Sequence, residues 1–183
     1  MRAIEFYTTP EGDVMIRELG GIERRLSESD RDFIVGFNGV IEEFYPEAYA
    51  AMKKAYAKSA ANRVYNDYLI ARRFIKCNFG DYDNMIDLDE NWNFHFEFVG
   101  CPLRGECTGD RVICQPKFCS KMSDRQMDVM RMCYNGKNDE EIAESLYITL
   151  DTVRNHRKNV FRKLNLHSMS EFMRYAHTNN LFK

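Results

Sequence analysis

Residues 138–171 read NDEEIAESLYITLDTVRNHRKNVFRKLNLHSMSE, and this stretch decides the fold of the C-terminal third of the chain. Asn138 with Glu141 is a helix start signal, and Thr149 caps a second, longer helix after a short turn. A helix of about eight residues, a turn of three to four residues and a basic helix together form a helix-turn-helix unit. The stretch therefore predicts this unit.

Two further helices are expected around it. Ser123-Asp-Arg-Gln126 is a capping box, and the helix that it opens should stop at Asn135-Gly136. Ser168-Met-Ser-Glu171 opens a last helix. We therefore expect a four-helix domain over residues 121–183, with a domain boundary near residue 120.

The helix that follows Thr149 separates its apolar and polar side chains. The apolar residues share one arc of the helical wheel: Leu150, Val153, Val160 and Leu164. Asn155, Lys158 and Arg162 lie on the opposite arc, and Arg154 lies at its flank. Between Arg154 and Lys163 there are five basic residues and no acidic one. Outward cationic and amide side chains are what a helix needs to contact base edges and phosphates in the major groove.

The segment from Ser123 to Phe182 resembles the LuxR-type (GerE-like) helix-turn-helix domain, whose pattern is EIA…L.IS..TV..H...I..KL.V.S..E. The resemblance covers about 60 of the 183 residues. It implies double-stranded DNA as a partner, binding as a homodimer on inverted half-sites, and RNA polymerase as a further partner. By resemblance, three residues would contact bases: Arg154, Asn155 and Lys158. Three others would contact the DNA backbone: Thr152, Arg157 and Lys163.

Charge is distributed unevenly along the chain. The net charge of −2 divides into +3 for residues 121–183, with 11 basic and 8 acidic residues, and −5 for the remainder. A basic end fits contact with nucleic acid. No apolar run has the length of a membrane span, and the N-terminus lacks the apolar region of a signal peptide. We therefore expect a cytoplasmic protein with no membrane partner.

The front two-thirds of the chain predict an α+β domain. Alternating apolar residues around Thr-Pro-Glu-Gly-Asp, at 9–13, indicate a β-hairpin, and the pattern from Ser27 to about Cys77 indicates helices, the first of which ends at Pro46. The acidic stretch Asp81–Asn91 reads as a solvated loop, because its spacing does not match a calcium-binding loop. Trp92–Val99 alternates as a strand does.

Five of the six cysteines lie within 43 residues, most of them in a turn-rich loop at residues 101–119. The spacings of five, six and four residues along this loop match no standard zinc or iron–sulfur motif. A metal centre, either zinc or an iron–sulfur cluster, is nevertheless one hypothesis. Its core ligands would be Cys101, Cys107 and Cys114, with Cys77 or Cys119 as the fourth. The other hypotheses are a thiol–disulfide pair and thiols that are merely buried.

The sequence as a whole predicts a mainly α protein. It would have an α+β N-terminal domain at 1–120 with a Cys-rich loop, followed by the four-helix domain. The leading functional hypothesis is a DNA-binding transcriptional regulator that responds to metal or redox state. An alternative is a DNA-binding regulator whose N-terminal domain docks a protein partner, with zinc as a structural staple. A nucleic-acid enzyme with a DNA-binding tail is the remote alternative, and the absence of catalytic spacing predicts that the protein is not an enzyme.

Overall fold

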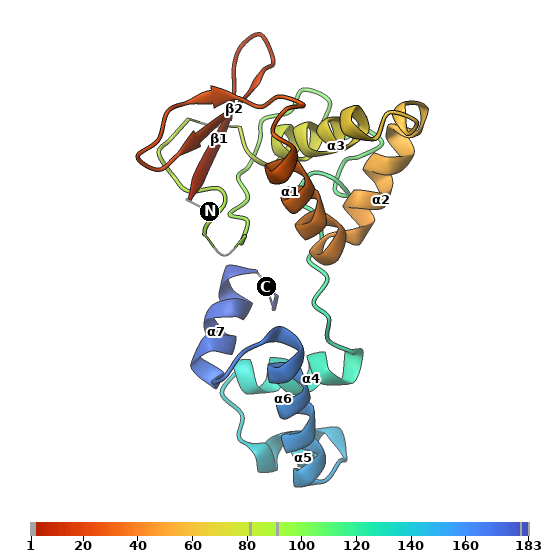
Figure 1. Ribbon diagram of the computed structural model, residues 1–183. Coiled ribbons are helices and arrows are strands. Elements are labelled where there is room, and N and C mark those ends of the chain that lie inside the picture. Colours follow the sequence, from red (N-terminus) through yellow and green to blue (C-terminus); the bar gives the residue numbers. More distant parts are fainter. Residues whose placement is uncertain (1–2, 81, 91, 180, 183) are drawn as a thin grey trace. The chain divides into compact units, whose positions relative to one another are not determined.

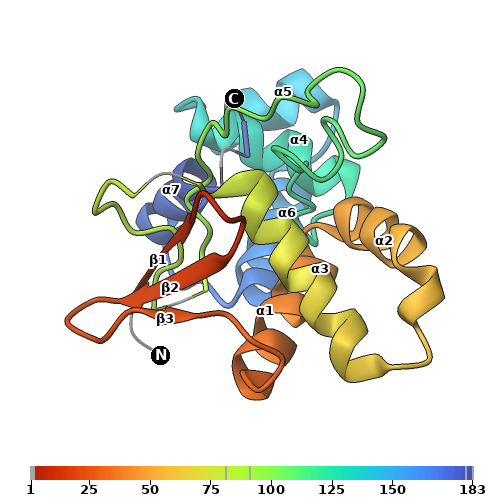
Figure 2. The same cartoon turned by 90° about the horizontal axis from the view of Figure 1, so that it is seen from above.

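The computed structural model describes residues 3–80, 82–90, 92–179 and 181–182, and it is drawn in Figures 1 and 2. The chain divides into two compact units, Met1–Cys119 and Ser120–Lys183. The first unit contains these elements: β1 (Ile4–Thr8), β2 (Val14–Glu18), β3 (Arg24–Arg25), α1 (Arg31–Phe44), α2 (Pro46–Ala55), the 3₁₀ turn η1 (Ala57–Ser59) and α3 (Arg63–Asn78). The second contains four helices: α4 (Asp124–Tyr134), α5 (Asp139–Leu146), α6 (Leu150–Leu164) and α7 (Met169–Thr178).

The N-terminal hairpin forms as the sequence predicts. Strands β1 and β2 are antiparallel, with Thr8 opposite Val14, and β3 adds a short third strand beside β2. Gly12 has a φ of +86°, which a side chain would strain, so the turn depends on this glycine. The alternate residues Phe6 and Ile16 are fully buried and face the helices.

Helices α1 and α3 pack against this hairpin, and α2 packs against these two helices. Pro46 occupies the first turn of α2, where its missing N–H costs nothing, and α1 ends two residues earlier as expected. Helix α3 contacts α1, α2 and both long strands, and Figure 2 shows it between the hairpin and α2. Phenylalanine rings fill the centre of the unit: Phe37 lies 5.9 Å from Phe74 and 5.1 Å from Phe94, between ring centroids. Aromatic pairs at these separations stabilise a core beyond their buried area.

The predicted strand Trp92–Val99 is wrong. The structure has one isolated antiparallel bridge there, between Leu88 and Phe94, and otherwise irregular chain. Trp92 has a φ of +63°, which turns the backbone at the start of the segment. The aromatic side chains still divide, since Phe94 is buried whereas Phe98 is 68% exposed. The alternation of apolar and polar residues reflects the packing of rings into the core. No described strand pairs along the segment, so it does not join a sheet.

The C-terminal unit begins each helix at the residue that the sequence predicts. Ser123 and Asn138 form complete capping boxes with Gln126 and Glu141. Each of these boxes satisfies two backbone N–H groups that would otherwise lack partners. Thr149 caps α6 in the same position, and Ser168 caps α7. Local chemistry therefore sets all four helix starts of this unit.

No helix in the described part of the chain has the length and apolar character that crossing a bilayer requires.

Candidate nucleic-acid interface

Helix α6 is fixed in the C-terminal unit by its apolar arc. Val153 and Val160 are fully buried, one in a cluster with residues of α4 and α5 and the other in a cluster with residues of α4 and α7. The Thr149 hydroxyl accepts from the Thr152 amide at 3.2 Å, and Asn165 ends the helix in the left-handed conformation with a φ of +53°. The packing leaves the opposite arc of α6 without cover from its own unit.

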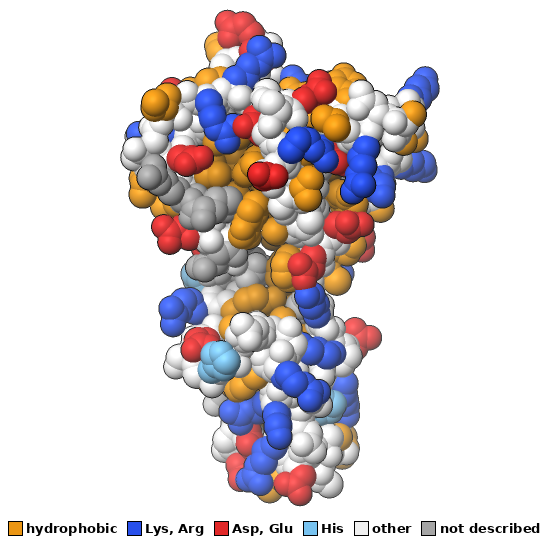
Figure 3. Space-filling model, in the orientation of Figure 1, with side chains coloured by type: hydrophobic (Ala, Val, Ile, Leu, Met, Phe, Trp, Pro, Cys, Tyr) orange, Lys and Arg blue, Asp and Glu red, His pale blue; other side chains and the backbone are white. Residues whose placement is uncertain are grey.

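The outward arc carries the side chains that the sequence predicts to contact DNA. Arg154, Asn155, Lys158 and Arg162 are all exposed. On the face drawn in Figure 3, Lys and Arg side chains follow one another along the C-terminal unit. An exposed helical face of amide and cationic groups can offer bidentate hydrogen bonds to purines and charge to phosphates.

Two residues that are predicted to contact the DNA backbone already bind other side chains within the domain. Arg157 is only partly exposed, and its Nη1 lies 2.5 Å from Oδ1 of Asp139 at the start of α5. The Lys163 Nζ donates to Oε1 of Gln126 at 2.8 Å. These bonds tie α6 to α5 and α4. For both residues the assignment to the DNA backbone stays a prediction.

Asp139 also attracts Arg154, whose Nε lies 3.8 Å from Oδ2, and Asp151 lies 3.6 Å from the other side of the same guanidinium. Arg154 itself is exposed and such surface pairs are weak, so the two carboxylates attract the guanidinium without fixing it. The sequence analysis missed this role of Asp139. No spacing signal could have found it, because Asp139 reads only as the first residue of an acidic helix start.

The turn between α5 and α6 exposes one large ring. Tyr147 ends α5 with a φ of +54°, and its side chain is 96% exposed. The next amide, Ile148 N, donates to the Ala143 carbonyl at 3.0 Å and closes α5. The turn is therefore fixed by backbone hydrogen bonds.

In the N-terminal unit, the structure brings three of the five predicted ligand cysteines together. Cys114 neighbours Cys77, and Arg73 Nη2 donates to Cys107 Sγ at 3.2 Å. Burial raises the pKa of the Cys114 thiol to about 11, and the neighbouring Cys77 adds to the rise. Arg73 was missed by the sequence analysis, although it precedes Cys77 by four residues and so shares its helix face.

The other two predicted ligands lie elsewhere on the loop surface. Cys101 is half-buried, whereas Cys119 is exposed and its amide donates to the Phe44 carbonyl at 2.7 Å. Within the described residues, no three His, Cys, Asp or Glu side chains form a group that could hold a metal ion. As placed, the sulfur atoms do not fit zinc or an iron–sulfur cluster, both of which need several converging ligands. The metal hypothesis stays a prediction.

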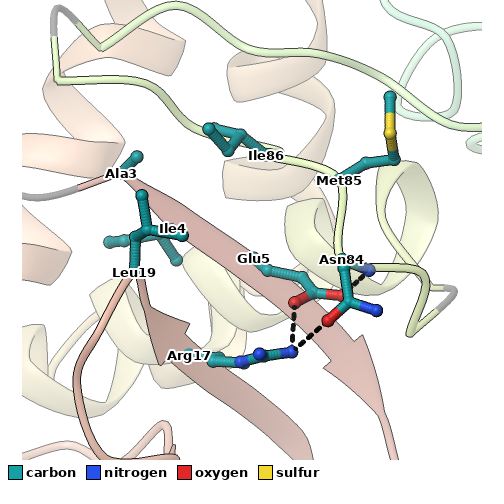
Figure 4. Close-up of a pocket in the computed structure, with 8 residues that line it drawn as sticks. All are labelled: Ala3, Ile4, Glu5, Arg17, Leu19, Asn84, Met85 and Ile86. Atoms are coloured by element: carbon teal, nitrogen blue, oxygen red, sulfur yellow. Dashed lines mark hydrogen bonds and ion pairs between the residues drawn. The ribbon is translucent and has the colours of Figure 1, made fainter.

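A small cavity lies where the hairpin meets the loop at residues 84–86. It holds about 90 Å³, well below the roughly 300 Å³ of ordinary small-molecule pockets. Figure 4 shows its polar side, where Arg17 Nη1 lies 3.1 Å from Glu5 Oε2 and 2.7 Å from Asn84 Oδ1. Because these polar groups bond to one another, we interpret the cavity as a gap in the packing and not as a ligand site.

The geometry of the C-terminal unit agrees with comparisons to known proteins. Residues 120–176 match the family model described as bacterial regulatory proteins, luxR family. This segment is a LuxR-family helix-turn-helix domain. The predicted resemblance is thereby confirmed for this part of the chain. No solved structure matches the chain.

Several curated proteins are similar to the LuxR-family domain. The Fimbriae Z protein of Salmonella typhimurium is 40% identical over 60 residues, which are 33% of this chain and 29% of that protein. The transcriptional regulatory protein LiaR of Bacillus subtilis is 33% identical over 60 residues, which are 33% of this chain and 28% of that protein. The oxygen regulatory protein NreC of Staphylococcus carnosus is 34% identical over 55 residues, which are 30% of this chain and 26% of that protein. The chain thus spans less than a third of the length of each of these relatives.

Proposed function

We propose that this protein is a sequence-specific transcriptional regulator that reads duplex DNA with the outward arc of α6. The comparisons support this proposal, since the C-terminal domain is of the LuxR family and LiaR is named a transcriptional regulatory protein. The finer assignment, of which side chains touch bases, is the proposal.

One observation carries it. The four outward side chains Arg154, Asn155, Lys158 and Arg162 are exposed on a helix whose other face buries Val153 and Val160. Arginine pairs bidentately with guanine and asparagine with adenine, so this arc contains groups able to distinguish base pairs. Asp139, which holds Arg157 and approaches Arg154, would keep the helix start in one arrangement before DNA arrives.

The proposal is tested by selecting duplexes from a random pool with the full-length protein. Wild type should enrich a short motif within a few rounds, and Asn155→Ala should enrich a motif relaxed at one position, because it removes one base contact. Enrichment of no sequence by wild type, at a salt concentration where non-specific binding is weak, would contradict sequence-specific recognition.

Three further parts of the function are proposed on the same basis. A homodimer on DNA would pair two copies of α6 across an inverted repeat, as helix-turn-helix dimers do when half-sites lie one helical turn apart. We place the protein in the cytoplasm with DNA, and we name RNA polymerase as a partner for the regulator on its promoter. A palindromic enriched motif supports the dimer, and a single half-site counts against it.

The N-terminal unit is proposed to receive the signal through its cysteines. We favour redox chemistry over metal binding because Cys77 and Cys114 are neighbours, whereas the described residues include no three-ligand group. The alternative is a docking domain with zinc as a staple. Metal analysis and a visible spectrum of protein purified without oxygen decide between them: one zinc or one iron–sulfur centre per chain would restore the metal hypothesis.

A further inference from the structure

A cation and a thiol stand side by side near the end of α3. Arg73 and Cys77 are four residues apart and therefore share one face of the helix. Two cysteines of the loop at residues 101–119 meet this face. Cys107 Sγ accepts from Arg73 Nη2 at 3.2 Å. Burial and the neighbouring Cys77 thiol both raise the pKa of Cys114, as expected for two thiols that lie close together.

The backbone around Cys114 is clamped by the residue that follows Cys77. Asn78 is completely buried, and its Nδ2 donates to the Ile113 carbonyl at 2.8 Å. Its Oδ1 accepts from the Gln115 amide, also at 2.8 Å. The two bonds bracket Cys114 on both sides. Because breaking either would leave a buried polar group unpaired, the Cys114 sulfur is held beside Cys77.

The guanidinium of Arg73 reaches both parts of the cluster. Its Nη2 donates to Cys107 Sγ, and Cys77 lies one helical turn further along the same face of α3. The Gly109 amide also points at the Cys107 sulfur, at 3.4 Å. The Nε of Arg73 is buried and, among the described atoms, has no acceptor. An oxygen added to a neighbouring sulfur would supply one.

We propose that Cys77 and Cys114 form a dithiol that a hydroperoxide oxidises to a disulfide, with Arg73 as the positioning residue. The disulfide proposal rests on the function proposed above in one respect: it names the class of signal that the regulator would receive. The chemistry itself needs no DNA. The position of Cys114 beside the end of α3, the clamp of Asn78 on the loop and the hydrogen bond from Arg73 to Cys107 carry the inference together.

The reaction balances with one hydroperoxide. Cys77 is half-buried whereas Cys114 is 8% exposed, so the Cys77 sulfur meets the oxidant first. It attacks the peroxide oxygen, the O–O bond breaks, and an alcohol (water, for hydrogen peroxide) leaves a sulfenic acid on Cys77. Cys114 Sγ then attacks that sulfur, the S–S bond forms, and the hydroxyl leaves as water with the thiol proton. The two sulfurs lose two electrons, which the peroxide gains.

The disulfide would join α3 covalently to the loop that leads by sequence into Ser120 and the LuxR-family domain. A cross-link of this kind stabilises a loop mainly by restricting its open conformations. The loop would thus be held to α3 in the oxidised protein and rely on hydrogen bonds in the reduced one.

The test uses the reduced full-length protein, without oxygen or DNA. It is treated with one equivalent of hydrogen peroxide, alkylated with N-ethylmaleimide, digested and analysed by mass spectrometry. We expect a cross-linked peptide pair containing Cys77 and Cys114, while Cys133, half-buried in α4, is alkylated. Cys77→Ser should lose the cross-link and Cys133→Ser should keep it. Arg73→Met should slow its formation at unchanged far-ultraviolet dichroism, and Arg73→Lys should restore part of the rate.

Two results would overturn the proposal. One is full alkylation of Cys77 and Cys114 after peroxide, or a cross-link through other cysteines. The other is about one zinc or iron centre per purified chain that Cys77→Ser abolishes, since the thiols would then be metal ligands. Neither result depends on DNA binding, so each is distinguishable from failure of the function proposed above.

Discussion

Asp87 is a carboxyl group enclosed by the N-terminal unit, with 1% of its surface exposed. Its Oδ2 accepts from the Phe6 amide at 2.6 Å, and its side chain also hydrogen bonds with Glu97. Burial raises the pKa of Asp87 to about 8, and the nearby carboxylates of Glu97 and Glu5 push it in the same direction. At neutral pH the group is therefore largely protonated and can donate to Glu97.

This protonation makes the stability of the N-terminal unit depend on pH. An unfolded Asp titrates near pH 4, so between about pH 4 and 8 the folded unit holds a proton that the unfolded chain releases. The free energy of unfolding should fall as pH rises through this window, by at most about 1.4 kcal/mol per pH unit from one group. Asp87→Asn, which keeps a donor and an acceptor, should flatten this slope.

Urea unfolding at several pH values, followed by the fluorescence of the single tryptophan, measures the effect. Trp92 stacks on Phe33 at a centroid distance of 6.2 Å and so reports on this unit. Equal slopes for wild type and Asp87→Asn would show that Asp87 does not carry the proton.

At the residue scale, the sequence predicted what local spacing encodes. Caps such as Ser123 and Asn138 were found because their hydrogen bonds span three residues. Asp87 and Asp139 gain their roles from partners distant in sequence, so no local pattern marks them. Arg73 shares a helix face with Cys77, but its hydrogen-bond partner Cys107 is 34 residues away.

At the scale of elements, the cap of α5 fixes where the helix-turn-helix begins. Asn138 Oδ1 accepts from the Glu141 amide at 2.8 Å, and Glu141 Oε2 accepts from the Asn138 amide at 2.9 Å. Asn138→Ala should lower the free energy of unfolding of the C-terminal unit by about 1 kcal/mol, because the first turn of α5 loses its acceptor.

Hydrogen exchange in the peptide covering α5 checks this prediction, with Asn138→Asp as the matched control that retains a capping oxygen. Faster exchange in both variants would mean that the side-chain NH2 group of Asn138, and not its Oδ1 acceptor, is what stabilises the helix start. Unchanged exchange in Asn138→Ala would remove the cap from the account of how α5 begins.

Elements differ in how far sequence alone predicts them. Each helix of the C-terminal unit has its own start signal, and each was predicted. The segment Trp92–Val99 alternates like a strand, but among the described residues its β-pairing is an isolated bridge at Phe94. Whether alternating residues form a strand depends on a partner strand, and that partner is not encoded in the segment.

At the scale of the whole molecule, the division at Cys119–Ser120 predicts independent folding of the C-terminal unit. Its helices have their own caps, and its two buried clusters consist of residues from α4 to the C-terminal end of the chain. A fragment of residues 120–183 should show helical dichroism and a cooperative thermal transition in isolation. A fragment without cooperative melting would show that this unit needs residues 1–119 to fold.

The whole-molecule organisation was only partly accessible from sequence. The change from a cysteine-rich loop to capped helices marked a boundary near residue 120, and the basic character of α6 marked its outward face. The meeting of Cys77 with Cys114 was not derivable as a pair, because the clamp of Asn78 on the loop exists only in the folded unit.

Base recognition by α6 is the central claim, and a fluorescence anisotropy titration of the selected duplex tests it most directly. Wild type, Lys158→Ala and Arg174→Ala should be compared at one salt concentration. Both variants remove one exposed positive charge, but Arg174 lies on α7. Lys158→Ala should weaken binding by about 1–3 kcal/mol on the selected duplex, and Arg174→Ala by much less. Equal affinities for Lys158→Ala and wild type would contradict the assignment of α6 as the reading helix.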